Sequence, residues 1–196
     1  MSDRPPFRAE HIGSLLRPAA LKRANAARED DPAAYDAALE AATAAAIRMQ
    51  EEVGLRCISD GEFRRASWFS AFFQAMPASF GQTRSRFRFH DEDGGEHSWP
   101  TCCATAPIRR RGGITLGEYE AIRSHTDRLP KVTMPTPSAF HFFAGDGCTD
   151  SFVYPDLDEF WEDLVQVYRQ EIAALHEAGA SYLQLDEVPL AMLCDP

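Results

Sequence analysis

The sequence lacks any apolar run long enough to cross a membrane. No stretch of its 196 residues approaches the roughly 18 consecutive apolar positions that a membrane-spanning helix needs. The opening segment, Met1 to Pro6, contains Asp3, Arg4 and a pair of prolines, so the apolar core of a secretory signal is missing. We therefore expect a cytoplasmic protein with no membrane partner.

Positive charge is also scarce. The chain has 20 lysines and arginines against 30 aspartates and glutamates, which gives a formal net charge of −10. A surface that binds nucleic acid needs cations to neutralise phosphates, so this balance argues against a nucleic-acid partner. The basic run from Arg109 to Arg111 is too short to reverse the balance and is interpreted as a solvated strand end.

Cysteine is sparse and irregularly spaced. The five cysteines are an odd number without CxxC spacing, which argues against a disulfide framework and against a local zinc-finger site. HExxH and His-x-Cys are absent as well. No GxGxxG or GxxxxGK[ST] motif follows a predicted strand, which weakens a nucleotide-binding alternative. By itself, the chain shows no metal site.

What the sequence does contain is a repeated alternation of helix and strand. An Ala-rich stretch over 19–47 predicts helix, with Pro18 and Asp31-Pro32 as starts. Gly54 is a plausible stop, and a short strand over 55–59 then leads to the polar turn Asp60-Gly61-Glu62. The pattern recurs as a helix over 156–178 followed by a strand over 181–185 that ends in Asp186-Glu187. We also expect a helix over 116–126 and strands over 131–135 and 9–12.

Residues 80–112 depart from this alternation. The segment from Arg84 to His90 alternates polar and aromatic side chains, and Asp93-Gly94-Gly95 favours a turn. These features predict an inserted β-hairpin, followed by a return strand over 102–108 that enters the main sheet.

These elements indicate an α/β fold with about five parallel strands in a single domain over 1–196. The count fits an open doubly wound sheet or five of the eight units of a TIM-like (β/α)8 barrel. The strands end in small or acidic residues, such as Ser14, Glu62 and Asp186. In a barrel all such ends meet at one mouth, so we favour a partial barrel with an inserted hairpin.

Three separated segments carry a family resemblance. They are His11-Ile-Gly-Ser-Leu-Leu-Arg-Pro, Asp60-Gly-Glu-Phe-Arg-Arg and Tyr182-Leu-Gln-Leu-Asp-Glu. In this order and spacing they resemble the catalytic barrel of cobalamin-independent methionine synthase and its single-barrel relatives. The resemblance covers essentially the whole chain. It implies transfer of a methyl group to the thiol of homocysteine by an enzyme of methionine biosynthesis.

The resemblance also implies which residues hold the amino acid. The family's Ile-Gly-Ser turn, which binds the carboxylate end of homocysteine, matches Ile12, Gly13 and Ser14. The family's strand-end acids, which hold the ammonium group, match Glu62 and Asp186. Glycine lets backbone N–H groups approach an anion, and a pair of carboxylates suits an ammonium group.

Two further residues have supporting roles in this interpretation. Arg65 matches a family arginine and is expected to orient the carboxylate of Glu62. His11 lies beside the Ile-Gly-Ser turn and is a candidate substrate contact, although local packing is the commoner role for such a histidine.

The match to the family fails in two places. The arginine and tryptophan that grip folate in the family are replaced by Cys102 and by the segment from Met134 to Pro137, so folate does not carry over as the methyl donor. The family's zinc ligands come from the last three barrel strands, whereas this chain stops at Pro196, after its fifth predicted strand. Zinc is therefore expected of the complete family protein, with ligands absent from this chain.

Two alternatives stay open. One is another thiol alkyl-transfer or carbon–sulfur reaction on the same barrel, as in epoxyalkane–coenzyme M transferases. The other is a truncated, non-catalytic relative that binds an amino acid or a protein. Since five units leave one edge of the sheet open, we expect a longer natural protein or a truncated gene product, with self-association through that edge.

Overall fold

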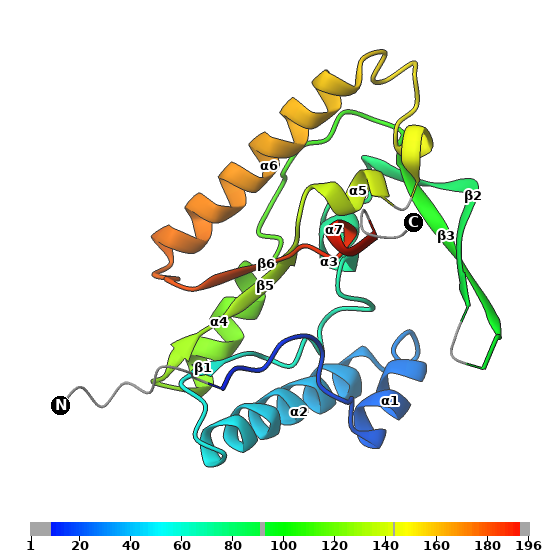
Figure 1. The fold of residues 1–196 in the computed structure, drawn as a ribbon. Helices are drawn as coiled ribbons and strands as arrows, with labels where there is room; N and C mark the ends of the chain where they lie inside the picture. Colours follow the sequence, from blue (N-terminus) through cyan, green and yellow to red (C-terminus); the bar gives the residue numbers. More distant parts are fainter. Residues whose placement is uncertain (1–8, 91–92, 143, 193–196) are drawn as a thin grey trace.

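A computed structural model describes residues 9–90, 93–142 and 144–192 of the chain. It shows a mixed α/β fold, as predicted, in which helices pack around short strands (Figure 1). No helix of the described residues is long and apolar enough to span a membrane.

The first two helices form a pair at one end of the molecule (Figure 1). They are α1 (Ala19–Ala26) and α2 (Pro32–Glu52). Helix α2 begins where the sequence predicts, because Asp31 accepts a 3.0 Å hydrogen bond from the Ala34 N–H and Pro32 occupies the first turn. Leu21, Leu39 and Phe63 are buried in the cluster that joins the two helices.

The parallel strands are short and meet along one extended segment. Strand β4 (Leu129–Pro130) pairs with β1 (Cys57–Ile58), and β5 (Val132–Pro135) pairs with β6 (Leu183–Asp186). Lys131 lies between β4 and β5, and its N–H donates to Ile58 O. The segment 129–135 therefore bonds to β1 with its first half and to β6 with its second half.

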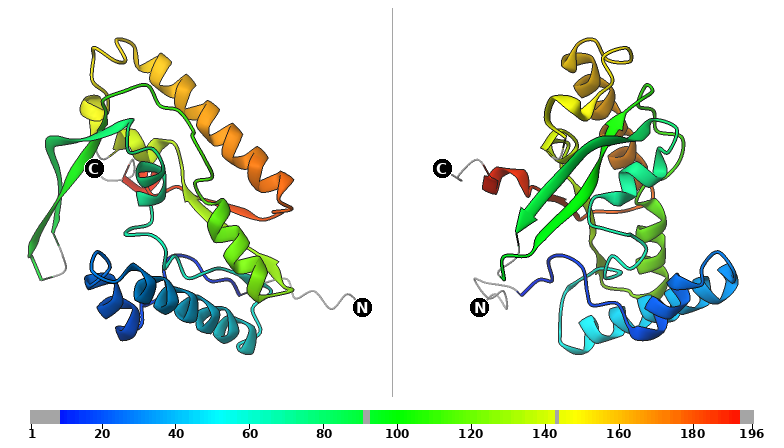
Figure 2. Two further views of the ribbon diagram at one scale, coloured as in Figure 1. Left: turned by 180° about the vertical axis from the view of Figure 1, so that it is seen from behind. Right: turned by 90° about the vertical axis from the view of Figure 1, so that its right-hand side faces the viewer.

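The predicted hairpin consists of β2 (Phe80–His90) and β3 (Glu96–Ala104), which pair in antiparallel register around the turn at Asp93 to Gly95. It extends along one side of the molecule, at the right of Figure 1 and at the left of the rear view in Figure 2. Its base joins the body through a parallel bridge between Ala104 and Thr149 and through the Phe80 ring, which packs on Phe73 and Phe140.

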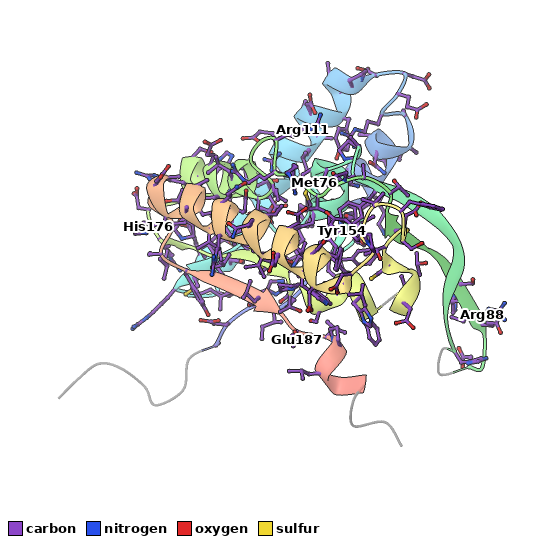
Figure 3. The ribbon with its side chains drawn as sticks, turned by 90° about the horizontal axis from the view of Figure 1, so that it is seen from above. Met76, Arg88, Arg111, Tyr154, His176 and Glu187 are labelled. Carbon is purple, nitrogen blue, oxygen red and sulfur yellow. The ribbon has the colours of Figure 1, made fainter. Side chains whose placement is uncertain are left out.

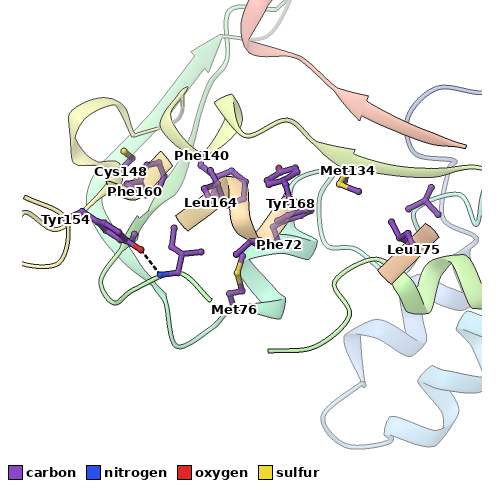
Figure 4. Close-up of a cluster of buried hydrophobic side chains, with 14 of the residues drawn as sticks. Phe72, Met76, Met134, Phe140, Cys148, Tyr154, Phe160, Leu164, Tyr168 and Leu175 are labelled. Atoms are coloured by element: carbon purple, nitrogen blue, oxygen red, sulfur yellow. Dashed lines mark hydrogen bonds between the residues drawn. The ribbon is translucent and has the colours of Figure 1, made fainter. Parts of the chain in front are cut away.

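The main core lies beneath α6 (Leu157–Glu177), which is as long as α2. Phe160, Leu164 and Tyr168 lie four residues apart, a spacing that predicts one buried helix face, and they pack among the side chains shown in Figure 4. Tyr168 stacks on Phe72, with ring centroids 4.6 Å apart. The other elements are α3 (Ser70–Ala75), α4 (Leu116–His125), α5 (Ser138–Phe142), the 3-10 helix η1 (Gly145–Cys148) and α7 (Pro189–Met192).

Two strand predictions were wrong. Residues 9–12 form no strand, because side chains hold this segment: the Lys131 ammonium donates to His11 O, and Tyr182 donates to Glu10. The return strand ends at Ala104 instead of continuing to Ile108, since the N–H groups of Thr105 and Ala106 turn to Ser79 O. The described parallel sheet is consequently narrower than the five strands expected.

Candidate amino-acid-binding site

The strand-end turn at Asp60 to Glu62 has a backbone that most residues avoid. Gly61 and Glu62 have φ angles of 75° and 60°, and Glu62 is the one non-glycine residue with positive φ in the described part of the chain. The Asp60 carboxylate holds the turn by accepting a 2.8 Å hydrogen bond from the Glu62 N–H. Strained backbone of this kind costs about 1–3 kcal/mol and is concentrated at functional sites.

The turn presents the Glu62 carboxylate to two hydroxyl groups. Ser14 Oγ donates to Glu62 Oε2 at 2.6 Å, and Thr133 Oγ1 donates to Glu62 Oε1 at 3.0 Å. Glu62 is only 2% exposed. A carboxylate has about four acceptor positions, so after these two bonds Glu62 can still accept hydrogen bonds from a bound cation.

Arg65 stabilises this arrangement through contacts with Thr133 and Glu118. Its guanidinium makes a bidentate pair with Glu118 of α4 and donates to Thr133 Oγ1 at 3.0 Å, whereas Glu62 Oε1 lies 4.0 Å away. Burial raises the pKa of Glu118 to about 7, against the opposing effect of its hydrogen bond from Arg65. Arg65 therefore acts on Glu62 mainly through Thr133, more indirectly than the expected orienting contact.

Asp186 ends β6 on the same side of the sheet. It is paired in register with Pro135, two residues beyond Thr133. Burial raises the pKa of Asp186, and the negative charge of Glu62 raises it further, while a 2.6 Å hydrogen bond from Gln184 opposes both. Thr133 bonds to Glu62, and Asp186 follows two positions further along the same pair of strands, so the two carboxylates lie near the same strand ends. A cation placed between them would stabilise both charges.

The Ile-Gly-Ser turn lies at the rim of this region. The Leu15 N–H donates to Gly61 O at 3.1 Å, which fixes the turn against the strand-end acids. The Ile12 side chain is 74% exposed, and Gly13 has a φ of 81°. The ring Nε2 of His11 lies 2.5 Å from Gly13 O, so this side chain is engaged with its own loop.

The fold thus brings Ser14 and Glu62 into contact and places Asp186 at the end of the strand beside Thr133, the second partner of Glu62. Sequence reasoning missed Thr133 and Glu118, which complete the hydrogen bonds behind Glu62. The signal for Glu118 would have been a carboxylate on the apolar face of a predicted helix, since it is 6% exposed. Arg17 was also missed, although it donates to the carbonyl groups of both Glu62 and Arg65.

Glu187, labelled in Figure 3, follows Asp186 between β6 and α7, and its carboxylate accepts a 2.7 Å hydrogen bond from Ser138. Its hydrogen bonds are with Ser138 and the Leu190 N–H, whereas Asp186 is bonded by Gln184. Adjacent carboxylates therefore have separate partners.

The described residues do not fit a zinc ion. Among them, no group of three or more histidine, cysteine, aspartate or glutamate side chains could hold a metal. Burial raises the pKa of Cys102, Cys103 and Cys148, so these thiols are protonated at neutral pH.

Comparisons with known proteins identify the family to which the chain belongs. A family model described as the catalytic domain of cobalamin-independent synthase matches residues 9–194. The uncharacterised protein YxjH of Bacillus subtilis is 29% identical over 93% of this chain and 48% of its own length. The 5-methyltetrahydropteroyltriglutamate–homocysteine methyltransferase of Thermosynechococcus vestitus is 30% identical over 95% of this chain and 24% of its own length. The chain therefore spans half or less of these relatives.

Solved structures give the same result. A putative vitamin-B12-independent methionine synthase from Listeria monocytogenes superposes with a TM-score of 0.73 at 25% identity. The match covers 100% of this chain and 56% of the Listeria chain. A B12-independent methionine synthase from Shewanella sp. W3-18-1, solved in complex with selenomethionine, has a TM-score of 0.60 at 19% identity. The match covers 79% of this chain and 43% of the Shewanella chain. The second similarity concerns the fold alone.

Proposed function

Because the chain belongs to the family of the cobalamin-independent synthase catalytic domain, we propose that Ser14, Glu62 and Asp186 bind the amino-acid end of homocysteine. The proposal is supported by the 2.6 Å hydrogen bond from Ser14 to Glu62 and by the position of Asp186, two residues beyond Thr133 in the register of β5 and β6. The carboxylates accept hydrogen bonds from the ammonium group, and the backbone of Ile12 to Ser14 faces the ligand's carboxylate. Charge-assisted hydrogen bonds of this kind contribute roughly 1.5–3 kcal/mol each.

The reaction we propose for the complete protein is methyl transfer to the homocysteine sulfur. The thiol loses its proton, a sulfur–methyl bond forms, and the bond between the methyl group and its donor breaks. In this chain the proposed residues hold and orient the amino acid. We assign no described residue to activating the sulfur, because the described cysteines are not placed as metal ligands.

We also infer that the chain is part of a (β/α)8 barrel. In support, β1, β5 and β6 run parallel and their carboxyl ends carry the proposed site, as barrel strands do. The methyl donor is not assigned. The names of the methyltransferase relatives specify a folate, but the residues of this chain depart from the family's folate-binding pattern.

Calorimetry with the purified chain tests the proposal. L-Homocysteine should bind, and Glu62→Gln should weaken it by about tenfold or more, since one charged partner of the ammonium group is lost. Glu187→Gln is the matched control: it removes an equal charge one residue from Asp186, with expected changes under about twofold. Equal affinities for wild type and Glu62→Gln would refute the proposed site.

The same titration separates the alternatives. The sulfonate thiol 2-mercaptoethanesulfonate has no ammonium group, so two carboxylates should reject it, whereas an enzyme of the coenzyme M type should prefer it. If homocysteine binds but no methyl transfer is measured with any donor, the non-catalytic alternative gains support for this chain.

A further inference from the structure

A cavity lined by many cationic side chains lies beside the segment Phe63–Ala66. It has a volume of about 330 Å³ and is bounded by α1, by the segment Phe63–Ala66 and by Gln74 of α3. Five of its lining residues are cationic: Arg17, Lys22, Arg28, Arg64 and Arg65. None of the lining residues described is an aspartate or glutamate. In a chain with a net charge of −10, this is a pronounced local excess of positive charge.

The charge of Arg65 is already matched by Glu118, but the others are compensated weakly. Arg17 donates to the carbonyl oxygens of Glu62 and Arg65, which are neutral acceptors. Arg64 donates a long, 3.5 Å hydrogen bond to Glu40, and its Nε lies 3.9 Å from Asp60 Oδ2. Its Nε is buried with no hydrogen-bond partner. Arg17 and Arg64 therefore retain capacity to bind an anion.

The two remaining cationic residues, Lys22 and Arg28, also line the cavity. Lys22 is an exposed residue of α1, and the Arg28 guanidinium lies 4.4 Å from the centroid of the Tyr35 ring. Stacking on a buried aromatic ring orients a guanidinium while leaving its N–H groups free to bind. Asn25 and Gln74 add neutral hydrogen-bonding groups to the same lining.

We propose that this cavity binds a small, multiply charged oxyanion of the phosphate or polycarboxylate type. Converging cations repel one another, and a ligand with several negative charges removes that repulsion while satisfying their hydrogen-bond donors. The volume is at the lower end of the range for ligand pockets, which suits a compact anion. Arg17 also bonds to the carbonyl of Glu62, so the anion site and the amino-acid site share one side chain. The anion site does not depend on the proposed function.

Calorimetric titration of the chain with pyrophosphate and with citrate, at one fixed low ionic strength, tests this site. The double variant Lys22→Gln/Arg28→Gln should weaken binding by about tenfold or more. The control Arg23→Gln/Arg48→Gln removes the same charge from exposed positions of α1 and α2 outside the cavity, and should change affinity by less than about threefold. Tighter binding of pyrophosphate would indicate a phosphate ligand, and tighter binding of citrate a polycarboxylate.

Two results would overturn the proposal. One is the absence of binding of either anion to the wild-type chain. The other is an equal loss in the two double variants, which would show a response to overall charge. Thermal unfolding confirms that the variants fold, and the single pair Lys22→Gln and Arg23→Gln repeats the comparison on one helix while keeping the contact between Arg28 and Tyr35. Because homocysteine is absent from these titrations, failure here is distinguishable from failure of the amino-acid site.

Discussion

The Ser14 hydroxyl donates a 2.6 Å hydrogen bond to Glu62 Oε2 and so joins segments 48 residues apart. Glu62 is buried in the turn that follows β1, and Ser14 is exposed, so this bond connects a buried turn to a loop at the surface. A hydroxyl that donates a hydrogen bond to a carboxylate orients that carboxylate. The bond therefore prepares Glu62 to receive a cation.

Loss of this bond should affect binding more than stability. We expect Ser14→Ala to weaken homocysteine binding by about five- to tenfold, because Glu62 loses a charge-assisted partner. The free energy of unfolding should fall by less than about 1 kcal/mol, since Ser14 is exposed. Ser124→Ala is the control, because Ser124 Oγ bonds to Ala121 O on the exposed surface of α4. Calorimetry and urea unfolding measure the two effects, and equal affinities for both variants would contradict the expectation.

Gly61→Ala should destabilise the protein by about 1–3 kcal/mol. The φ of Gly61 is 75°, and an added Cβ would lie 3.1 Å from Phe63 Cε1 and 3.2 Å from the Leu15 side chain. Gly117→Ala is the matched control, since a Cβ there meets nothing within 4 Å. That substitution, in helix α4, should be neutral or stabilising by up to about 1 kcal/mol. Urea unfolding compares the variants, and an unchanged midpoint for Gly61→Ala would show that the turn can relax.

Glu171→Ala should lower the free energy of unfolding by about 3 kcal/mol. Glu171 is 0% exposed and accepts hydrogen bonds from the N–H groups of Ile114 and Thr115 and from the Arg110 side chain. Burial alone would raise its pKa, but these hydrogen bonds outweigh burial and lower the pKa below the ordinary 4.5.

The sign of the pH effect follows from that lowered pKa. Since the folded state holds Glu171 ionised more strongly than the unfolded state, its contribution is present above pH 4.5 and is lost as the pH falls through the folded-state pKa. The difference in stability between wild type and Glu171→Ala should therefore shrink in acid. Glu177→Ala, at the exposed end of the same helix, should show neither effect. A difference that stays constant with pH would contradict the assigned hydrogen bonds.

Homocysteine binding should weaken as the pH falls from neutral into the acid range. Burial and Glu62 raise the pKa of Asp186, so Asp186 is protonated at a higher pH than an ordinary aspartate and then no longer attracts the ammonium group. The ligand's ammonium group stays charged over this interval. Calorimetry across the pH series measures the effect, and Asp186→Asn should shift the decline in affinity to lower pH. An unshifted profile in Asp186→Asn would assign the titration to another group.

Removal of metal should leave homocysteine binding unchanged. The contacts proposed for the amino-acid end are hydrogen bonds from and to Ser14, Glu62 and Asp186, and no metal ligands have been assigned to this chain. We expect the same affinity after dialysis against a chelator and after addition of zinc. A large gain in affinity with zinc would show that the sulfur finds a metal in this chain.

The self-association expected from the sequence remains a prediction. Within the described residues, β6 pairs with β5 alone, and Leu185 on this strand is 46% exposed. If a second copy covers this edge, Leu185→Lys should shift the chain toward monomer in sedimentation velocity. Phe152→Lys is the control, since Phe152 is 96% exposed on a loop outside the strands. A wild-type chain that sediments as a monomer at all concentrations would refute the prediction.

Helices were the most predictable part of the fold. Apolar residues spaced three to four positions apart predict one buried face on α2 and one on α6, and Tyr35, Leu39, Phe160 and Leu164 are buried on those faces. The same spacing also places three residues there that are exposed instead: Met49 at 41%, Ile172 at 41% and Val53, beyond the last turn of α2, at 67%. Strands were less predictable, since a strand depends on a partner that periodicity does not specify. Residues 9–12 have strand-like composition but are held by side chains.

The sequence by itself determined the family, the helices and the three short segments whose strand-end residues form the candidate site. These features rest on local sequence patterns, which can be recognised without knowledge of the fold. Tertiary structure alone decided that Thr133 and Glu118 complete the hydrogen bonds around Glu62 and Arg65, and that four weakly compensated cations from separate segments line one cavity. The physical reason is that hydrogen bonds and charge interactions act over a few ångströms in space, whereas their partners lie tens of residues apart in the chain.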